Sequence, residues 1–143
     1  MMINSDKTIM TWFSKDIVAM FNRLVPDSFE FMKTDYDMTG PENSDPLGYV
    51  YRGADYSIHI GLAPRDGFQT IFISNANERE YRASLESLYV ESGLGPAQDI
   101  SHSAITTHAM QKAIESNVRA VRNTICRLKQ NDRQLLFEKC HGR

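Results

Sequence analysis

The stretch GYVYRGADYSIHI, residues 48–60, decides the fold, because apolar and polar residues alternate on both sides of one glycine. Alternation with a period of two is typical of a β-strand that buries one face. Gly53-Ala54 fits a two-residue hairpin turn with glycine at its first central position. In that register Arg52 faces Asp55. The pattern predicts one apolar face made of Tyr49, Tyr51, Tyr56, Ile58, Ile60 and Leu62.

Asp55, Ser57 and His59 contain the residue types of a catalytic triad. A triad requires the histidine between the serine and the acid, whereas here the serine is in the middle. Residues i and i+2 of a strand are also about 6.6 Å apart, too far for the short hydrogen bonds of a triad. We therefore predict no catalysis from these residues. Arg52, Asp55 and His59 are instead candidates for a secondary contact with a partner.

The segments before this stretch are interpreted from their periodicity. Residues 9–25 place apolar side chains at helical spacing, and Pro26 is expected to end that helix. SFEFMKTDY, residues 28–36, is interpreted as a strand with Phe29 and Phe31 on one face. Residues 37–46 are rich in Gly, Pro, Asn and Asp and are expected to form an irregular surface loop.

After the hairpin, FQTIFIS at 68–74 is apolar on both faces and reads as a central strand. A helix capped by Ser74 or Asn75 is expected to follow and to stop at Gly93. A long helix from Ser103 to Gln130 would extend about 42 Å. Its apolar seam at 114–128, or the end at 135–137, is expected to support a homodimer, because so long a seam exceeds what a domain this size readily covers.

Together these patterns predict a single α+β domain over residues 1–143. An N-terminal helix is followed by a meander of about four antiparallel strands. Two or three helices then cover one face, with a long C-terminal helix among them.

Composition excludes several classes of protein. Hydrophobic residues make up 41% and charged residues 24% of the 143 residues, as in globular domains. The longest purely apolar run, Ile17–Phe21, is far short of the roughly 20 residues that span a bilayer. The first ten residues lack the pattern of a secretory signal. We expect a cytoplasmic protein without a membrane partner.

Metal and cofactor chemistry has little support in the sequence. Cys126 and Cys140 are expected to be free thiols, and His141 lies where the C-terminus is expected to fray. Asp35 and Asp37 form a DxD pair, but no nucleotide-binding loop accompanies them. We expect no metal or cofactor. The chain has a net charge of −2 and no aromatic stacking motif. Both observations argue against nucleic acid as a partner.

Charge is distributed unevenly along the chain. Between Asp27 and Pro46 six acids stand against one lysine, a balance of −5, whereas from Lys112 onward eight bases stand against three acids, a balance of +5. The two regions either attract each other, are simply solvated, or serve external partners. The acidic segment is the candidate partner-binding surface, because recognition concentrates on loops held by a rigid scaffold. Its candidate residues are Asp35, Tyr36, Asp37, Glu42 and Asp45.

IHIGLAPRDGFQTIFISN, residues 58–75, is followed by a tyrosine-containing helix and the long C-terminal helix. Over about residues 47–130 this organisation resembles the small immunity proteins of bacterial polymorphic-toxin systems. The resemblance implies a non-catalytic inhibitor that binds and neutralises a cognate toxin or enzyme, often one with a basic surface. It identifies no individual functional residue.

Three alternatives from other classes remain. A chaperone or adaptor would dimerise through the long helix and carry a client segment on the sheet. A small-molecule-binding domain would use Tyr49, Tyr51 and His59. An enzyme would require a site of unfamiliar type.

Overall fold

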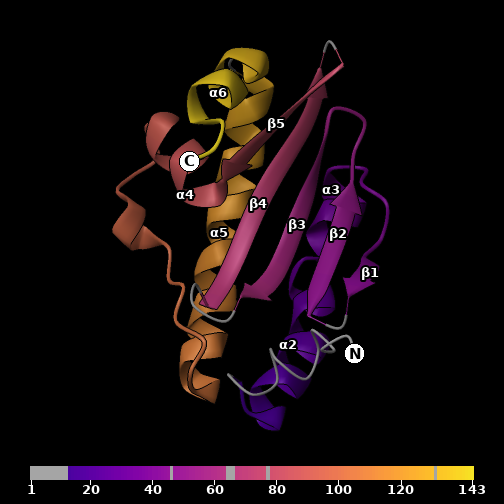
Figure 1. Cartoon of the computed structure of the whole chain (residues 1–143), viewed down its shortest axis with the longest axis vertical. Helices are drawn as coiled ribbons and strands as arrows, with labels where there is room; N and C mark the ends of the chain where they lie inside the picture. Colours follow the sequence, from indigo (N-terminus) through magenta and orange to yellow (C-terminus); the bar gives the residue numbers. More distant parts are fainter. Residues whose placement is uncertain (1–12, 46, 64–66, 77, 131) are drawn as a thin grey trace, which may run out of the picture.

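The computed structural model describes residues 13–45, 47–63, 67–76, 78–130 and 132–143. Five antiparallel strands form one sheet in the order β1-β2-β3-β4-β5, so each strand lies beside its neighbour in the chain (Figure 1). The strands are β1 Glu42–Asp45, β2 Gly48–Arg52, β3 Tyr56–Ala63, β4 Gly67–Ala76 and β5 Arg79–Ser84. The helices are α2 Lys15–Ser28, α3 Glu30–Asp35, α4 Leu85–Glu91, the 3-10 helix η1 Ala97–Asp99, α5 Thr107–Gln130 and α6 Arg133–Cys140. The predicted α+β order of helix, meander and helices is confirmed.

The predicted apolar face of the hairpin is correct, but its register is not. Tyr51, Ile58 and Ile60 are at most 1% exposed. Arg52 pairs with Ser57 rather than Asp55. The turn is longer than expected, because the Gly53 N–H donates to the Tyr56 carbonyl at 3.0 Å. The register therefore shifts by two residues, and an even shift leaves every side chain on its predicted face.

The predicted strand at 28–36 is wrong, because this segment forms α3. Phe29 and Met32 are three residues apart and both fully buried, which continues the helical spacing of α2. The expected loop at 37–46 contains β1, which pairs with the outer edge of β2. Its charged and polar sequence, ENSD, is common for an edge strand, where such residues discourage pairing with another chain.

The helix predicted from residue 75 begins ten residues later. Residues 79–84 form β5, with Tyr81 and Ala83 buried at strand spacing. Glu78, with φ 63°, adopts the left-handed conformation in the turn that precedes β5. Ser84 then caps α4 by accepting the Ser87 N–H at 3.2 Å. The chain leaves α4 before Gly93, whose φ is 75°, as expected for a glycine that terminates a helix.

Helices α2, α3 and α5 lie behind the sheet in the view of Figure 1, so the opposite face of the sheet carries no helix there. Helix α5 starts at Thr107 rather than Ser103 and is therefore about 36 Å long. Its seam faces the core, and Val121 and Ile125 are at most 1% exposed. Within the described residues the seam is thus covered by the chain itself. This removes the reason for expecting a homodimer through it.

A buried polar cluster fixes α5 against the central strand. Asn117 is fully buried, and its Oδ1 accepts from Thr70 Oγ1 of β4 at 2.9 Å. Its Nδ2 donates to the carbonyls of Ser101 and Ala113 at 3.1 and 2.8 Å. Ser116 Oγ accepts from the Ser101 N–H at 2.9 Å. One turn of α5 therefore binds both β4 and the segment that precedes the helix.

Pro26 lies inside α2 and does not end it. Proline has no N–H, so the carbonyl of Asn22, four residues earlier, loses its helical donor. Tyr49 of β2 replaces that donor, because its hydroxyl lies 3.3 Å from the Asn22 carbonyl and 3.0 Å from Asn22 Oδ1. The sheet thus compensates for the break in the helix. In contrast, the buried hydroxyl of Tyr51 has no hydrogen-bond partner among the residues that the structure describes.

Removing the hydroxyl should change the free energy of unfolding differently at these two tyrosines. Tyr49→Phe leaves the Asn22 carbonyl without its donor and should cost about 1 kcal/mol or more of unfolding free energy. Tyr51→Phe removes an unsatisfied buried polar group and should be neutral or stabilising by about 1 kcal/mol. Urea unfolding of the two variants measures both effects. A destabilising Tyr51→Phe would show that this hydroxyl has a partner.

Candidate functional site

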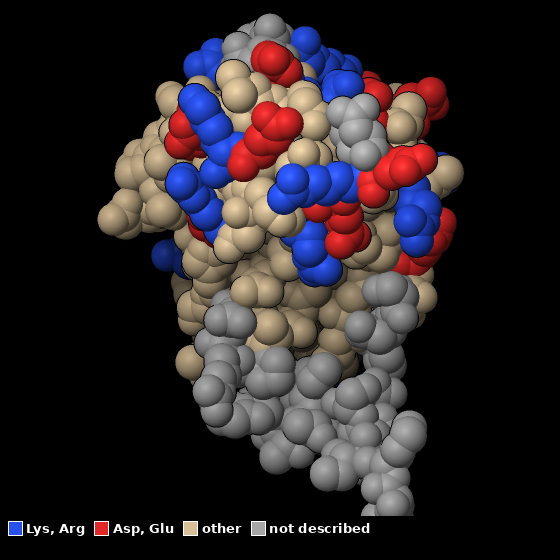
Figure 2. All heavy atoms as spheres, turned by 45° about the horizontal axis from the view of Figure 1, so that its top comes forward, with Lys and Arg blue, Asp and Glu red and all other residues tan. Residues whose placement is uncertain are grey.

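Most of the sequence-predicted site residues lie at one end of the molecule, which we call the charged end. It combines the end of α3, β1, the β2–β3 turn, the C-terminal part of α5 and the start of α6. Figure 2 shows acidic and basic side chains interleaved over this end. We define the charged end by Asp35, Asp37, Glu42, Asp55, Arg52, Arg122, Lys129 and Arg133.

Ion pairs connect the acidic segment to the basic helices. Asp35 lies 3.6 Å from Arg122, and Asp55 lies 3.2 Å from Arg133. The Asp35–Arg122 pair joins the acidic and basic regions, whereas the Asp55–Arg133 pair joins the β2–β3 turn to α6. Acids and bases therefore lie side by side at the charged end, and the acidic residues that are one candidate surface in the sequence stand next to basic ones in the fold.

Arg52 and Glu42 form a third pair at the charged end. Arg52 Nε donates to Glu42 Oε2 at 2.9 Å, and both side chains are half exposed or more. The predicted pair of Arg52 with Asp55 is thus wrong, because the longer turn moves Asp55 out of register. The backbone of Asp45 lies in β1, whereas its side chain is outside the described part of the structure.

A small hollow of about 170 Å³ lies within the charged end. Tyr36, Asp37, Asp55, Lys129 and Arg133 line it. Asp37 is exposed and adopts the left-handed conformation with φ 54°, and its carboxylate forms no ion pair with any described residue. The structure therefore brings together three of the predicted residues, two from the acidic segment and one from the turn.

Tyr36, a candidate contact residue of the acidic segment, is half-buried. Its hydroxyl lies 3.1 Å from Sγ of Cys126, and the Lys129 ammonium lies 4.8 Å from its ring centroid. Burial, followed by the hydrogen bond with Cys126, raises the pKa of Tyr36 to about 12. The phenol therefore stays neutral, and Tyr36 contributes an aromatic side chain to the lining of the hollow.

His59 lies apart from the charged end, on the helix-free face of the sheet. Ser57 Oγ is 3.1 Å from His59 Nε2, which corrects the prediction that these residues are too far apart to bond. The Cα spacing of a strand does not fix the distance between side-chain tips on one face. Asp55 pairs with Arg133 instead, so the three residues do not assemble as a triad. Burial first, and then the charges of Arg52 and Arg82, lower the pKa of His59.

The lowered pKa of His59 predicts a pH dependence of stability. The pKa of His59 in the unfolded chain is about 6.5. Just below that pH, His59 is protonated in the unfolded chain but still neutral in the folded chain. The stability that neutral His59 contributes is complete above about pH 6.5 and is lost as the pH falls toward its folded pKa. Urea unfolding between about pH 7.5 and 5.5 should show this loss in the wild type and a smaller loss in His59→Gln. His108→Gln, at an exposed position, serves as the control and should retain the wild-type slope.

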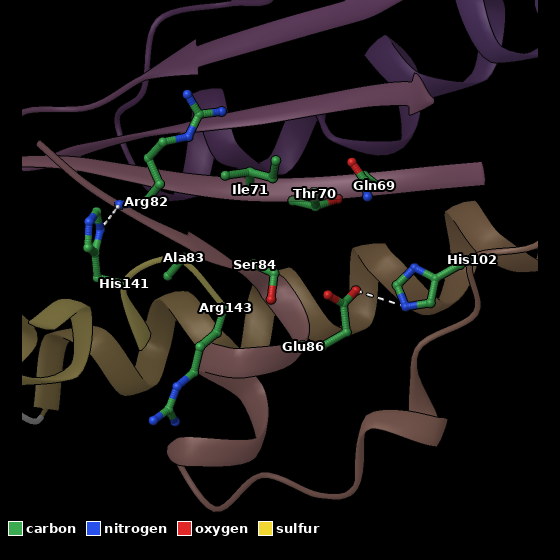
Figure 3. Close-up of a pocket in the computed structure, with 11 residues that line it drawn as sticks. Gln69, Thr70, Ile71, Arg82, Ala83, Ser84, Glu86, His102, His141 and Arg143 are labelled. Atoms are coloured by element: carbon green, nitrogen blue, oxygen red, sulfur yellow. Dashed lines mark hydrogen bonds and ion pairs between the residues drawn. The ribbon is translucent and has the colours of Figure 1, made fainter. Parts of the chain in front are cut away.

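A larger hollow of about 530 Å³ opens on the helix-free face, where β4 and β5 meet the segment around His102 (Figure 3). His102 Nε2 lies 2.9 Å from Glu86 Oε1 of α4, and its Nδ1 lies 3.1 Å from the Phe68 carbonyl. The 2.9 Å contact is not aligned as a hydrogen bond, so this buried Glu86 oxygen has no hydrogen-bond partner among the described residues.

The C-terminal residues 141–143 form the other wall of this hollow. They run along the edge of β5, where the Gly142 N–H donates to the Arg82 carbonyl at 2.8 Å and the Ser84 N–H donates to the Arg143 carbonyl at 2.9 Å. The Arg82 N–H donates to His141 Nδ1 at 3.0 Å. The expectation of a frayed end at His141 is therefore wrong. Sequence reasoning missed this hollow, because its residues come from four distant segments that no motif connects.

Other expectations concern metals, thiols and membranes. Cys126 and Cys140 are free, as predicted. Over the described ranges, no three His, Cys, Asp or Glu side chains converge as metal ligands. None of the described helices has the length and hydropathy needed to cross a bilayer.

No family model matches the chain, and no curated protein or solved structure matches it either. Function is therefore inferred from the geometry.

Proposed function

We propose that the chain is a non-catalytic, protein-binding inhibitor of the immunity or antitoxin type, which neutralises a cognate toxin or enzyme with a basic surface. The charged end is its contact surface. The observation that carries the proposal is the hollow lined by Asp37, Tyr36 and Asp55, in which the Asp37 carboxylate forms no ion pair with a described residue.

The size of the hollow favours a protein partner. Small-molecule sites occupy about 300–1,000 Å³, and 170 Å³ is below that range. The hollow would accommodate one side chain from a partner surface. A lysine or arginine entering it would meet Asp37, Asp55 and Tyr36, and would take the place of the Lys129 and Arg133 side chains that also line it. Arginine beside tyrosine is a frequent combination at energetic hot spots of interfaces.

The internal ion pairs do not block such a contact. The Asp35 and Arg122 side chains are each about half exposed, at 51% and 50%. Exposed pairs contribute only about 0–1 kcal/mol, so a cation of the partner can replace Arg122 or Arg133 at small cost. Because several acids of this end are already paired with bases of the same chain, we expect a partner's cation to exchange with these bases at the surface.

Charge reversal at the charged end tests the proposal. Wild-type protein on a resin is used to capture a partner from an extract of the source cells at about 0.05 M salt, and the purified partner is then titrated by calorimetry. Asp37→Lys with Glu42→Lys should weaken binding at least about tenfold. Raising salt to about 0.5 M should also weaken wild-type binding, because the Debye length falls below 10 Å.

Glu115→Lys is the matched control, because Glu115 is an exposed acid on the N-terminal half of α5. It should leave affinity unchanged. The activity of the captured protein should fall when wild-type chain is added, and the double variant should inhibit it less. If both variants bind alike, or if binding leaves the partner fully active, the proposed function is wrong.

A further inference from the structure

The helix-free face of the sheet carries two adjoining hollows. The larger encloses about 530 Å³, and a second one of about 190 Å³ lies beside it. Gln69 and Ile71 of β4 line both, so the two hollows share a floor. The larger volume alone is within the range of small-molecule sites, about 300–1,000 Å³.

The walls of the larger hollow are held by hydrogen bonds and ion-pair contacts of the folded chain. In Figure 3 Glu86 and His102 meet at one end of the hollow, and His141 lies at the other. The end near His102 is fixed to β4, because the Phe68 N–H donates to the His102 carbonyl at 2.9 Å. The opposite end is fixed by the hydrogen bonds of residues 141–143 to β5. A site with both ends fixed is formed before any ligand arrives.

The charges around these hollows favour an anion. Arg82 and Arg143 line the larger one, whereas its carboxylate side chain, Glu86, is already in contact with His102. Arg82 also acts across the sheet, since its charge contributes to the lowered pKa of His59, which lines the smaller hollow.

Hydrogen-bond donors and apolar contacts complete the site. His141 Nδ1 accepts the Arg82 N–H, so in its neutral form the ring carries its proton on Nε2 and that nitrogen is a donor. The amide of Gln69 adds a second donor. Ile71 on the floor gives an apolar surface for the body of a ligand.

We propose that this face binds a small organic anion with a flat apolar body, whose negative group lies near Arg82 and whose body packs on Ile71. The site lies on a different surface from the charged end and does not depend on the proposed inhibitory function.

The test uses two probes of equal size and opposite charge, 2-naphthoate and 2-naphthylmethylammonium. Each is titrated into the full chain with the methyl groups of isoleucine labelled for NMR. Naphthoate should shift the Ile71 methyl resonances and saturate with a Kd on the order of 1 mM or tighter. The ammonium probe should bind at least about tenfold more weakly.

Arg82→Glu should weaken naphthoate binding about tenfold or more. Arg79→Glu is the matched control, because Arg79 is an exposed arginine of the same strand that does not line the hollow. It should leave the affinity unchanged. The double variant Asp37→Lys, Glu42→Lys should bind naphthoate like the wild type, which separates this site from the charged end.

Three results would overturn the inference: no shift of Ile71 with naphthoate, equal binding of the two probes, or equal affinities of Arg82→Glu and Arg79→Glu. Amide spectra of each variant show whether the fold is retained. If Arg82→Glu does not fold, Arg82→Gln takes its place, with Arg79→Gln as its control.

Discussion

The hydrogen bonds of the Asn117 side chain connect three parts of the molecule, which are helix α5, the central strand β4 and the segment that precedes α5. Its carbonyl oxygen accepts from Thr70 in the central strand, and its amide nitrogen donates to Ser101 and to Ala113. Apolar packing alone tolerates sliding of a helix along a sheet, whereas a buried amide loses free energy when any partner moves away. Asn117 therefore sets the position of α5 on β4.

Both candidate surfaces follow from that position. The C-terminal part of α5 presents Arg122 and Lys129 to the acidic segment, which forms the charged end. The segment at 101–102, held by Asn117 and Ser116, places His102 against Glu86 and so closes one end of the larger hollow. Because α2, α3 and α5 share one side of the sheet, the outward side chains of β3, β4 and β5 are left to line the hollows.

The sequence predicted the fold class and the buried face of the hairpin because alternation depends only on neighbours in the chain. It failed at 28–36 and 79–84, where short apolar patterns fit a helix and a strand equally well. Phe29 follows Val25 at helical spacing, and this contact decided the first segment in favour of a helix. For the second, the turn at Glu78 allowed β5 to pair with β4, and that pairing outweighed the helical spacing of the apolar residues.

The candidate site was predicted only in part, because the charge of a sequence segment does not show which other charges lie beside it in the folded chain. Asp37 and Asp55 do line a common hollow, but Asp35 and Asp55 are paired with bases from about 80 residues further along the chain. Contacts between residues so far apart in the chain produce no local pattern in the amino-acid sequence. The same holds for His102 and His141, whose roles depend on where two distant segments meet the edge of the sheet.

Hydrogen–deuterium exchange of Asn117→Leu tests most directly whether this residue positions α5 and the segment before it. Leucine fills a similar volume but leaves Thr70 and Ser101 without their partner. The account predicts that the amides of Ser101 and Phe68 exchange about tenfold faster or more, while those in the centre of β3 keep most of their protection. Unchanged protection at Ser101 and Phe68, or an equal loss throughout the sheet, would contradict it.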